Sequence, residues 1–148
     1  MKKFLPLLML LSCAAPAAQA APDPVLGLWQ TTDEKTHAPS AIVKLEVVDD
    51  TLRGTIVKIF PYPGMPSDPV CKLCTDERRE KPILGMTIVS GLKRSANGQW
   101  SGGEILDPKI GKIYKVKLSA TENSKTMEVH GYIGASWLGK TRLWQREQ

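Results

Sequence analysis

The fold is decided by residues 129–146, which read Val-His-Gly-Tyr-Ile-Gly-Ala-Ser-Trp-Leu-Gly-Lys-Thr-Arg-Leu-Trp-Gln-Arg. Two runs of strand-forming residues flank a short break that contains glycine, and this pattern predicts a β-hairpin. In the second run Arg142, Trp144 and Arg146 alternate, so their side chains leave the strand on one face. Far upstream, residues 27–29 (Gly-Leu-Trp) open the first strand with another tryptophan. A closed sheet needs its first and last strands to meet, so we predict that these two ends form the closing seam of a barrel.

The first twenty residues have the pattern of an export signal. Lys2 and Lys3 form a charged start, residues 4–11 an apolar run, and residues 18–20 (Ala-Gln-Ala) a cleavage site. The apolar run is too short to cross a bilayer as a helix, which needs about 20 residues. We therefore predict a signal peptide over residues 1–20 and a periplasmic location.

A second processing route is compatible with the same segment. Residues 10–13 (Leu-Leu-Ser-Cys) resemble a bacterial lipoprotein box, which would place a lipid on Cys13. Leu11 fits that box poorly, so cleavage after Ala20 is favoured over lipidation.

The chain from residue 21 to residue 148 has the length of one domain with one core. Removing the signal lowers the formal net charge from +5 to +3, because residues 1–20 hold two lysines and no acid. The remaining charges are interspersed, which argues against a nucleic-acid surface. No later segment is long and apolar enough for a membrane span.

The rest of the chain alternates between short strands and turns. Long segments with helical periodicity are absent after the signal, which excludes a parallel sheet with crossover helices. We predict an all-β fold: a single closed antiparallel barrel of about eight strands. The predicted strands cover residues 25–31, 41–48, 51–60, 82–93, 99–106, 112–120, 125–132 and 137–146.

Residues 61–81 interrupt this pattern with a long, proline-rich loop that contains Cys71 and Cys74. Three interpretations of the cysteine pair compete. An oxidising compartment favours a local disulfide that orders the loop. A redox-active dithiol needs a stabilised thiolate, usually at a helix N-terminus. A closed zinc site needs four ligands, and only His37 and His130 are available to add nitrogen.

Several short motifs occur in a fixed order along the chain: Gly27-Leu28-Trp29, Cys71-Lys72-Leu73-Cys74, Leu84-Gly85-Met86, Trp100-Ser101-Gly102-Gly103, Asp107-Pro108, Gly111-Lys112, Tyr114, Gly131-Tyr132, Leu138-Gly139-Lys140-Thr141 and Trp144-Gln145-Arg146. By these motifs residues 25–146 resemble the domain of unknown function 2147 (DUF2147) family of exported bacterial proteins. The resemblance implies a lipocalin-like barrel with an internal cavity, and no established reaction. It also implies that Trp29 contacts either Arg142 or Arg146, because the opening Gly-x-Trp and the late arginine resemble the lipocalin signature.

Motifs for catalysis are not found in this sequence. It contains no Gly-x-Ser-x-Gly elbow, no His-Glu-x-x-His and no phosphate loop, and His130 has no visible triad partners, which favours a structural histidine over a catalytic base. Aromatic residues either fill the core or line a pocket. The predicted ligand-binding residues are Trp29, Tyr114, Tyr132, Arg142, Trp144 and Arg146.

These observations favour a non-enzymatic protein that binds a small apolar ligand or an envelope component, without a cofactor or metal. Two alternatives remain open. One is a thiol–disulfide redox protein that uses Cys71 and Cys74, and the other is an interaction module that docks through residues 61–81. The sequence does not indicate an oligomeric state.

Overall fold

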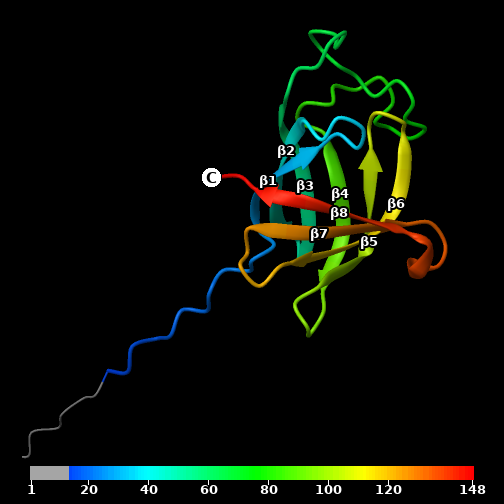
Figure 1. Ribbon diagram of the computed structural model, residues 1–148. Coiled ribbons are helices and arrows are strands. Elements are labelled where there is room, and N and C mark those ends of the chain that lie inside the picture. Colours follow the sequence, from blue (N-terminus) through cyan, green and yellow to red (C-terminus); the bar gives the residue numbers. More distant parts are fainter. Residues whose placement is uncertain (1–13) are drawn as a thin grey trace, which may run out of the picture.

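A computed structural model describes residues 14–148 of the chain. Alternation of apolar and polar residues along the sequence determines where its strands form. Each strand pairs antiparallel with the next, and the last returns to the first, so the sheet closes into a barrel (Figure 1). The elements are β1 (Gly27–Thr32), β2 (Pro39–Val48), β3 (Thr51–Ile59), β4 (Thr87–Arg94), β5 (Trp100–Asp107), β6 (Lys112–Ala120), β7 (Thr126–Tyr132), the 3₁₀ turn η1 (Ser136–Leu138) and β8 (Lys140–Arg146). The predicted fold class, a closed antiparallel barrel of eight strands, is confirmed.

The inner face of the barrel carries the apolar residue of each alternating pair. Trp100 and Trp144 are buried there, and the largest side chains that are fully buried are Trp29, Leu45, Leu52, Leu92, Leu106, Leu118 and Met127. Burying a leucine or methionine of this kind contributes about 1.5–3 kcal/mol relative to leaving it exposed. The core therefore supplies the main driving force for closing the sheet.

Two strands begin more than two residues later than expected. Residues 82–86 were expected to open β4, and this is wrong, because β4 begins at Thr87. Gly85 has a φ of 84°, which takes the backbone out of an extended conformation, and Ile83 donates its N–H to Pro69 within the long loop. The final strand also begins late, since residues 136–138 form η1 ahead of Lys140.

One end of the barrel is closed by residues 23–26, which precede β1. Val25 is fully buried, and its carbonyl accepts a hydrogen bond from the indole N–H of Trp29 at 2.8 Å. Asp23 accepts a hydrogen bond from Trp100 Nε1 at 3.2 Å and pairs with Arg94 at 2.6 Å. These contacts tie the lead-in segment to β4 and β5, so this end is called the closed end.

The opposite end carries the longer connections, including the loop of residues 60–86, drawn in green at the top of Figure 1. This loop folds back onto the turn between β5 and β6, where Cys71 Sγ lies 3.4 Å from the carbonyl oxygen of Pro108. Cys71 and Cys74 are both buried in this contact. The loop is therefore a packed part of the structure.

The segment ahead of the barrel bears on the predicted export signal. Residues 14–22 are exposed and form neither helix nor strand. The charged start and apolar run of the predicted signal, and the alternative lipidation site at Cys13, lie in residues 1–13, outside the described residues. Among the residues that are described, no helix has the length and apolar character to cross a membrane.

Candidate functional site

The closed end is built around Arg146 and Trp29. The two residues face each other across the β1–β8 seam, and the guanidinium carbon of Arg146 lies 4.2 Å from the centroid of the indole ring. The same guanidinium donates hydrogen bonds to the carbonyl oxygens of Ser124 at 2.6 Å, Leu26 at 3.0 Å and Pro24 at 2.5 Å. The expected contact between Trp29 and an arginine is present, and it involves Arg146. Each of its three guanidinium nitrogens donates a hydrogen bond, which favours a structural role for this arginine.

A row of inner-facing residues runs along β8 from the closed end to the loop end. Every second residue of β8 lies on this face, as expected from the period of a strand: Arg146, Trp144, Arg142 and Lys140. Trp144 is buried opposite Met127, whereas Arg142, opposite the buried Val129, is exposed. The buried part of the inner row of β8 therefore ends between Trp144 and Arg142.

The inner-facing residues of β6 also become more exposed from the closed end towards the loop end. Leu118 and Val116 are fully buried, Tyr114 is partly buried and Lys112 is exposed. The pairing of β6 with β7 is continuous and places Gly131 opposite Val116. Because Gly131 has no side chain, it leaves the inner surface beside Tyr114 uncovered, and a Cβ there would lie only 3.6 Å from Tyr114 Cβ.

The pairing between β1 and β8 stops before it reaches the loop end. These strands pair only at Trp29–Arg146 and Gln30–Gln145, whereas β7 pairs with β8 as far as Gly131–Lys140. Within the described strands, the edge of β8 before Gln145 therefore has no ladder partner on its β1 side. A single ion pair spans the gap, from Arg142 to Glu34 in the loop after β1, at 2.5 Å.

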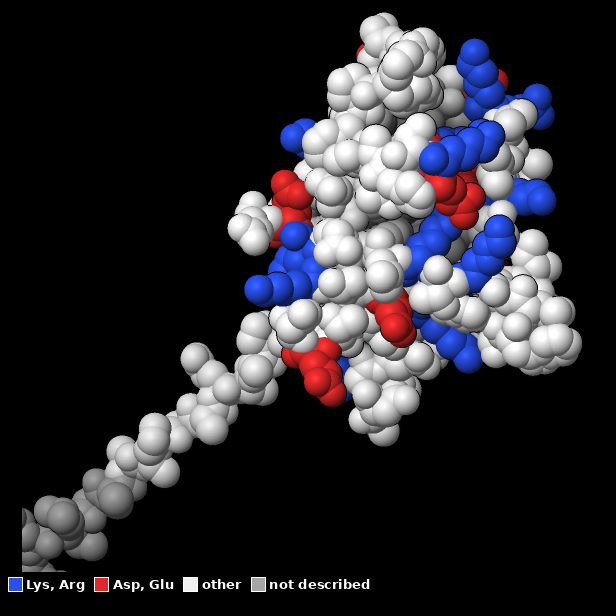
Figure 2. All heavy atoms as spheres, viewed as in Figure 1, with Lys and Arg blue, Asp and Glu red and all other residues white. Residues whose placement is uncertain are grey.

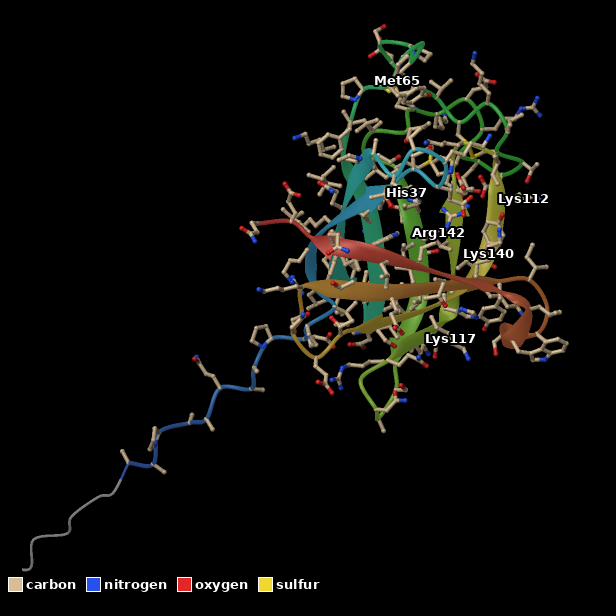
Figure 3. The ribbon with its side chains drawn as sticks, in the orientation of Figure 1. His37, Met65, Lys112, Lys117, Lys140 and Arg142 are labelled. Atoms are coloured by element: carbon tan, nitrogen blue, oxygen red, sulfur yellow. A yellow bond between two sulfur atoms is a disulfide. The ribbon has the colours of Figure 1, made fainter. Side chains whose placement is uncertain are left out.

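These observations define the mouth of the barrel as Tyr114, Arg142, Lys112, Lys140 and Ile105. Ile105 lies opposite both Tyr114 and Val89 and is partly buried against the core, so it supplies an apolar wall. The three cations supply a positive rim, and Figure 3 labels Lys112, Lys140 and Arg142 on the side of the barrel crossed by β8. An apolar wall under a cationic rim is suited to a ligand with an apolar body and an anionic group.

The six residues expected to bind a ligand are not brought together. Trp29 and Arg146 lie at the closed end, Trp144 lies in the core, and Tyr114 and Arg142 lie at the mouth. Tyr132 lies on the outer face, where its ring stacks on His130 at 5.8 Å. Tyr132 lies four residues after the exposed Glu128, so both side chains point to the same face of β7, and this even spacing was the sequence signal for the outward position of Tyr132. Period-2 spacing from Tyr114 and Arg142 would likewise have identified Lys112 and Lys140.

His130 lies on the outer wall rather than in the barrel. Its Nε2 lies 2.5 Å from the carbonyl oxygen of Ser136, and its Nδ1 lies 2.8 Å from the hydroxyl of Thr141. A carbonyl only accepts, so Nε2 carries a proton and donates it. Both ring nitrogens are engaged, which favours a structural role. A surface hollow of about 350 Å³ adjoins this histidine and is lined by Gln99, Lys117, Ser119, Glu128, His130, Ser136, Trp137 and Thr141.

Cys71 and Cys74 form a disulfide bond with Cα atoms 5.5 Å apart. Because the sulfur atoms are joined and both residues are buried, the structure favours the interpretation in which the bond orders the loop. Among residues 14–148 there is no group of three or more histidine, cysteine, aspartate or glutamate side chains arranged to hold a metal ion.

An ion pair holds the same loop near the disulfide. Arg78 donates to both carboxylate oxygens of Asp76 and, through Nη1, to the carbonyl oxygen of Thr87 at the start of β4. The Arg78 guanidinium lowers the pKa of Asp76, and the carboxylate raises the pKa of Arg78 in return. The hydrogen bond from Arg78 to Thr87 therefore attaches the loop to the start of β4, whereas the ion pair and the disulfide each join two residues within the loop.

Comparison with known proteins places this architecture in a wider group. The model of an uncharacterised protein family conserved in bacteria, DUF2147, matches residues 27–146. Among solved structures, a protein from the human pathogen Helicobacter pylori, described as belonging to the lipocalin family, superposes with a TM-score of 0.70 at 20% sequence identity. The superposition covers 83% of this chain and 82% of that chain, and shows a common fold. None of the curated proteins matches this chain.

Proposed function

We propose, from the premise that this chain belongs to the DUF2147 family of uncharacterised bacterial proteins, that it is an exported binding protein. Its ligand is a small amphiphile with an apolar body and an anionic group. The apolar body enters the mouth of the barrel between Tyr114 and Ile105, and the anionic group pairs with Arg142. No chemical step is involved.

The observation that carries this proposal is the change in exposure along the inner rows of β6 and β8. Trp29, Leu118 and Trp144 are buried inside the barrel towards the closed end, which favours a packed interior there. The mouth begins one inner position above these residues, at Tyr114 and Arg142, where inner-facing side chains meet solvent. A lipocalin-like fold supports the proposal, since ligands enter the mouths of such barrels.

The position of Arg142 supports an anionic group on the ligand. Its only ion pair in the described residues is with Glu34, and both side chains are about half exposed, at 45% and 52%. An exposed pair of this kind contributes about 0–1 kcal/mol, so a ligand carboxylate or phosphate can displace Glu34 at low cost. The bidentate geometry of a guanidinium suits both groups.

Native mass spectrometry of the protein isolated from its own cells tests the proposal. We expect a bound molecule of fixed mass that is released on denaturation and carries an acidic group. The variant Arg142→Gln should lose most of this adduct, whereas Arg53→Gln, an exposed arginine on the outer face of β3, should keep it. Protein that carries no adduct and fails to bind any acidic amphiphile added afterwards would overturn the proposal.

A further inference from the structure

The connection between β7 and β8 projects from the barrel wall (Figure 1), and it carries large apolar side chains that are exposed. We call residues 133–138 (Ile-Gly-Ala-Ser-Trp-Leu) the apolar tip. Ile133, Trp137 and Leu138 are 63%, 81% and 62% exposed, and no residue of η1 is buried. By contrast, Trp29, Trp100 and Trp144 are all buried. Trp137 therefore does not serve the core of this protein.

The apolar tip is held in a defined conformation. His130 anchors it through the hydrogen bond to Ser136, and Leu138 donates its backbone N–H to Ala135 at 3.1 Å. At the return to β8 the backbone is close-packed, since a Cβ at Gly139 would lie 2.3 Å from the carbonyl oxygen of Gly131. The protein thus presents Trp137 and Leu138 to solvent on a fixed turn, which reduces the entropy lost when a partner covers them.

Positive charge surrounds the base of the apolar tip. Residues 129–146 contain no acidic residue, and Lys140 lies two residues after Leu138. Lys117 on β6 lines the hollow that also contains Trp137, and the one acid of that hollow is Glu128. Figure 2 shows uncharged atoms projecting from this side of the molecule with lysine and arginine atoms beside them, and Figure 3 labels Lys117 and Lys140 on the same side.

We propose that the apolar tip docks this protein on the surface of an anionic phospholipid bilayer. Trp137, Leu138 and Ile133 enter the interface between headgroups and acyl chains, where tryptophan is favoured because its ring is apolar and its N–H is polar. Lys117 contacts lipid phosphates, and each basic residue near an anionic surface adds about 1 kcal/mol of attraction.

The shape of the apolar tip favours a bilayer over a protein partner. A stable protein interface buries about 800 Å² on each side and needs a broad complementary surface. The tip is instead a single turn of six residues that projects beyond the sheet, with cations behind it. A bilayer accepts such a projection without a matching groove, and a small apolar insertion combined with basic residues is sufficient for reversible binding. The inference does not depend on the proposed ligand.

Vesicle binding of the protein from residue 21 to residue 148 tests the inference. Vesicles of phosphatidylglycerol and phosphatidylethanolamine are compared with vesicles of phosphatidylcholine alone. We expect co-sedimentation with the anionic vesicles that weakens as salt is raised, together with a blue shift of tryptophan emission, because Trp137 is the exposed tryptophan. Trp137→Ser combined with Leu138→Ser should lower the partition coefficient by about tenfold or more, and Lys117→Gln by about fivefold.

Matched variants on other surfaces distinguish docking through the apolar tip from non-specific binding to vesicles. Leu73→Ser combined with Leu84→Ser removes two leucines of similar exposure from the long loop, and Lys93→Gln removes an exposed cation from β4. Both should bind vesicles as the unaltered protein does. The inference is overturned if the unaltered protein does not bind anionic vesicles, or if the Trp137 and Leu138 changes leave binding unaltered while circular dichroism shows a folded barrel.

Discussion

Arg146 on the last strand covers the indole of Trp29 on the first, 4.2 Å from the guanidinium carbon to the ring centroid. The pair joins the two strands that close the barrel, and Arg146 also holds the carbonyl oxygens of three residues from two other connections. A single side chain therefore links the strand seam, the lead-in segment and the β6–β7 turn. It does so at the end of the barrel opposite the proposed ligand.

Replacing Arg146 with alanine should lower the free energy of unfolding by about 3 kcal/mol, because a cation–π contact and several charge-assisted hydrogen bonds are lost. Arg142→Ala provides the control, since it removes an arginine from the same face of β8 whose ion pair is exposed and contributes about 1 kcal/mol or less. Urea unfolding followed by tryptophan fluorescence measures both. Equal losses in the two variants would contradict a special role for Arg146.

The packing of the long loop on the β5–β6 turn depends on Gly111. A Cβ at this position would lie 1.9 Å from the carbonyl oxygen of Leu73 and 2.8 Å from the backbone nitrogen of Cys74. We expect Gly111→Ala to detach the loop, which increases hydrogen exchange at residues 70–82 while the strands stay protected. Gly64→Ala is the matched control, because its φ is also positive but no atom lies within 4 Å of the added Cβ.

The disulfide between Cys71 and Cys74 should stabilise the loop without taking part in turnover. Cys71→Ala combined with Cys74→Ala is expected to lower the free energy of unfolding by about 2 kcal/mol, the value for closing so short a ring. Ligand binding at the mouth should be unaffected. Because both residues are buried, mild reductant should open the bond only slowly in the folded protein. Rapid reduction together with activity in an insulin-reduction assay would instead support the redox alternative.

Acid should loosen the same loop through Asp76. The Arg78 guanidinium lowers the pKa of this carboxyl below its ordinary value of 3.8. A carboxyl whose pKa is lowered on folding stabilises the native state above its unfolded pKa, and this stabilisation is lost as the pH falls through the folded pKa. Asp76→Asn should therefore be less stable than the unaltered protein near pH 6, and the difference should shrink as the pH falls through the lowered pKa. Asp68→Asn is the control, because it removes a carboxylate of the same loop that forms no ion pair among residues 14–148.

Much of the barrel could be predicted because its signals are local. The alternation in residues 41–48 and 112–120 is regular, and both segments form the strands that it indicates. The meeting of the first and last strands was predicted because a closed sheet must join its ends, and the contact of Trp29 with Arg142 or Arg146 was predicted from the family resemblance. Residues 82–86 misled the prediction, because Ile83 packs against the core from within the loop and so resembles a strand residue.

The candidate site was harder to predict than the fold. Amino-acid composition does not distinguish an aromatic residue of the core from one on the surface. Trp144 is buried, whereas Tyr132 lies on the outer wall and Trp137 is exposed. Their positions depend on which face of each strand turns inward and on where the core ends. Core filling depends on all strands together, so the level at which the buried part of the inner row of β8 ends, between Trp144 and Arg142, could not be obtained from any one segment.

Binding of an acidic amphiphile at the mouth can be followed by amide chemical-shift mapping with a medium-chain fatty acid. We expect large, saturable shifts at residues 112–116 and 140–143, no shifts at residues 27–30, and loss of the effect with Arg142→Gln. The corresponding fatty alcohol should bind more weakly, because it cannot pair with the guanidinium. Shifts confined to the outer wall around His130, or no saturable shifts at all, would show that the mouth is not the binding site.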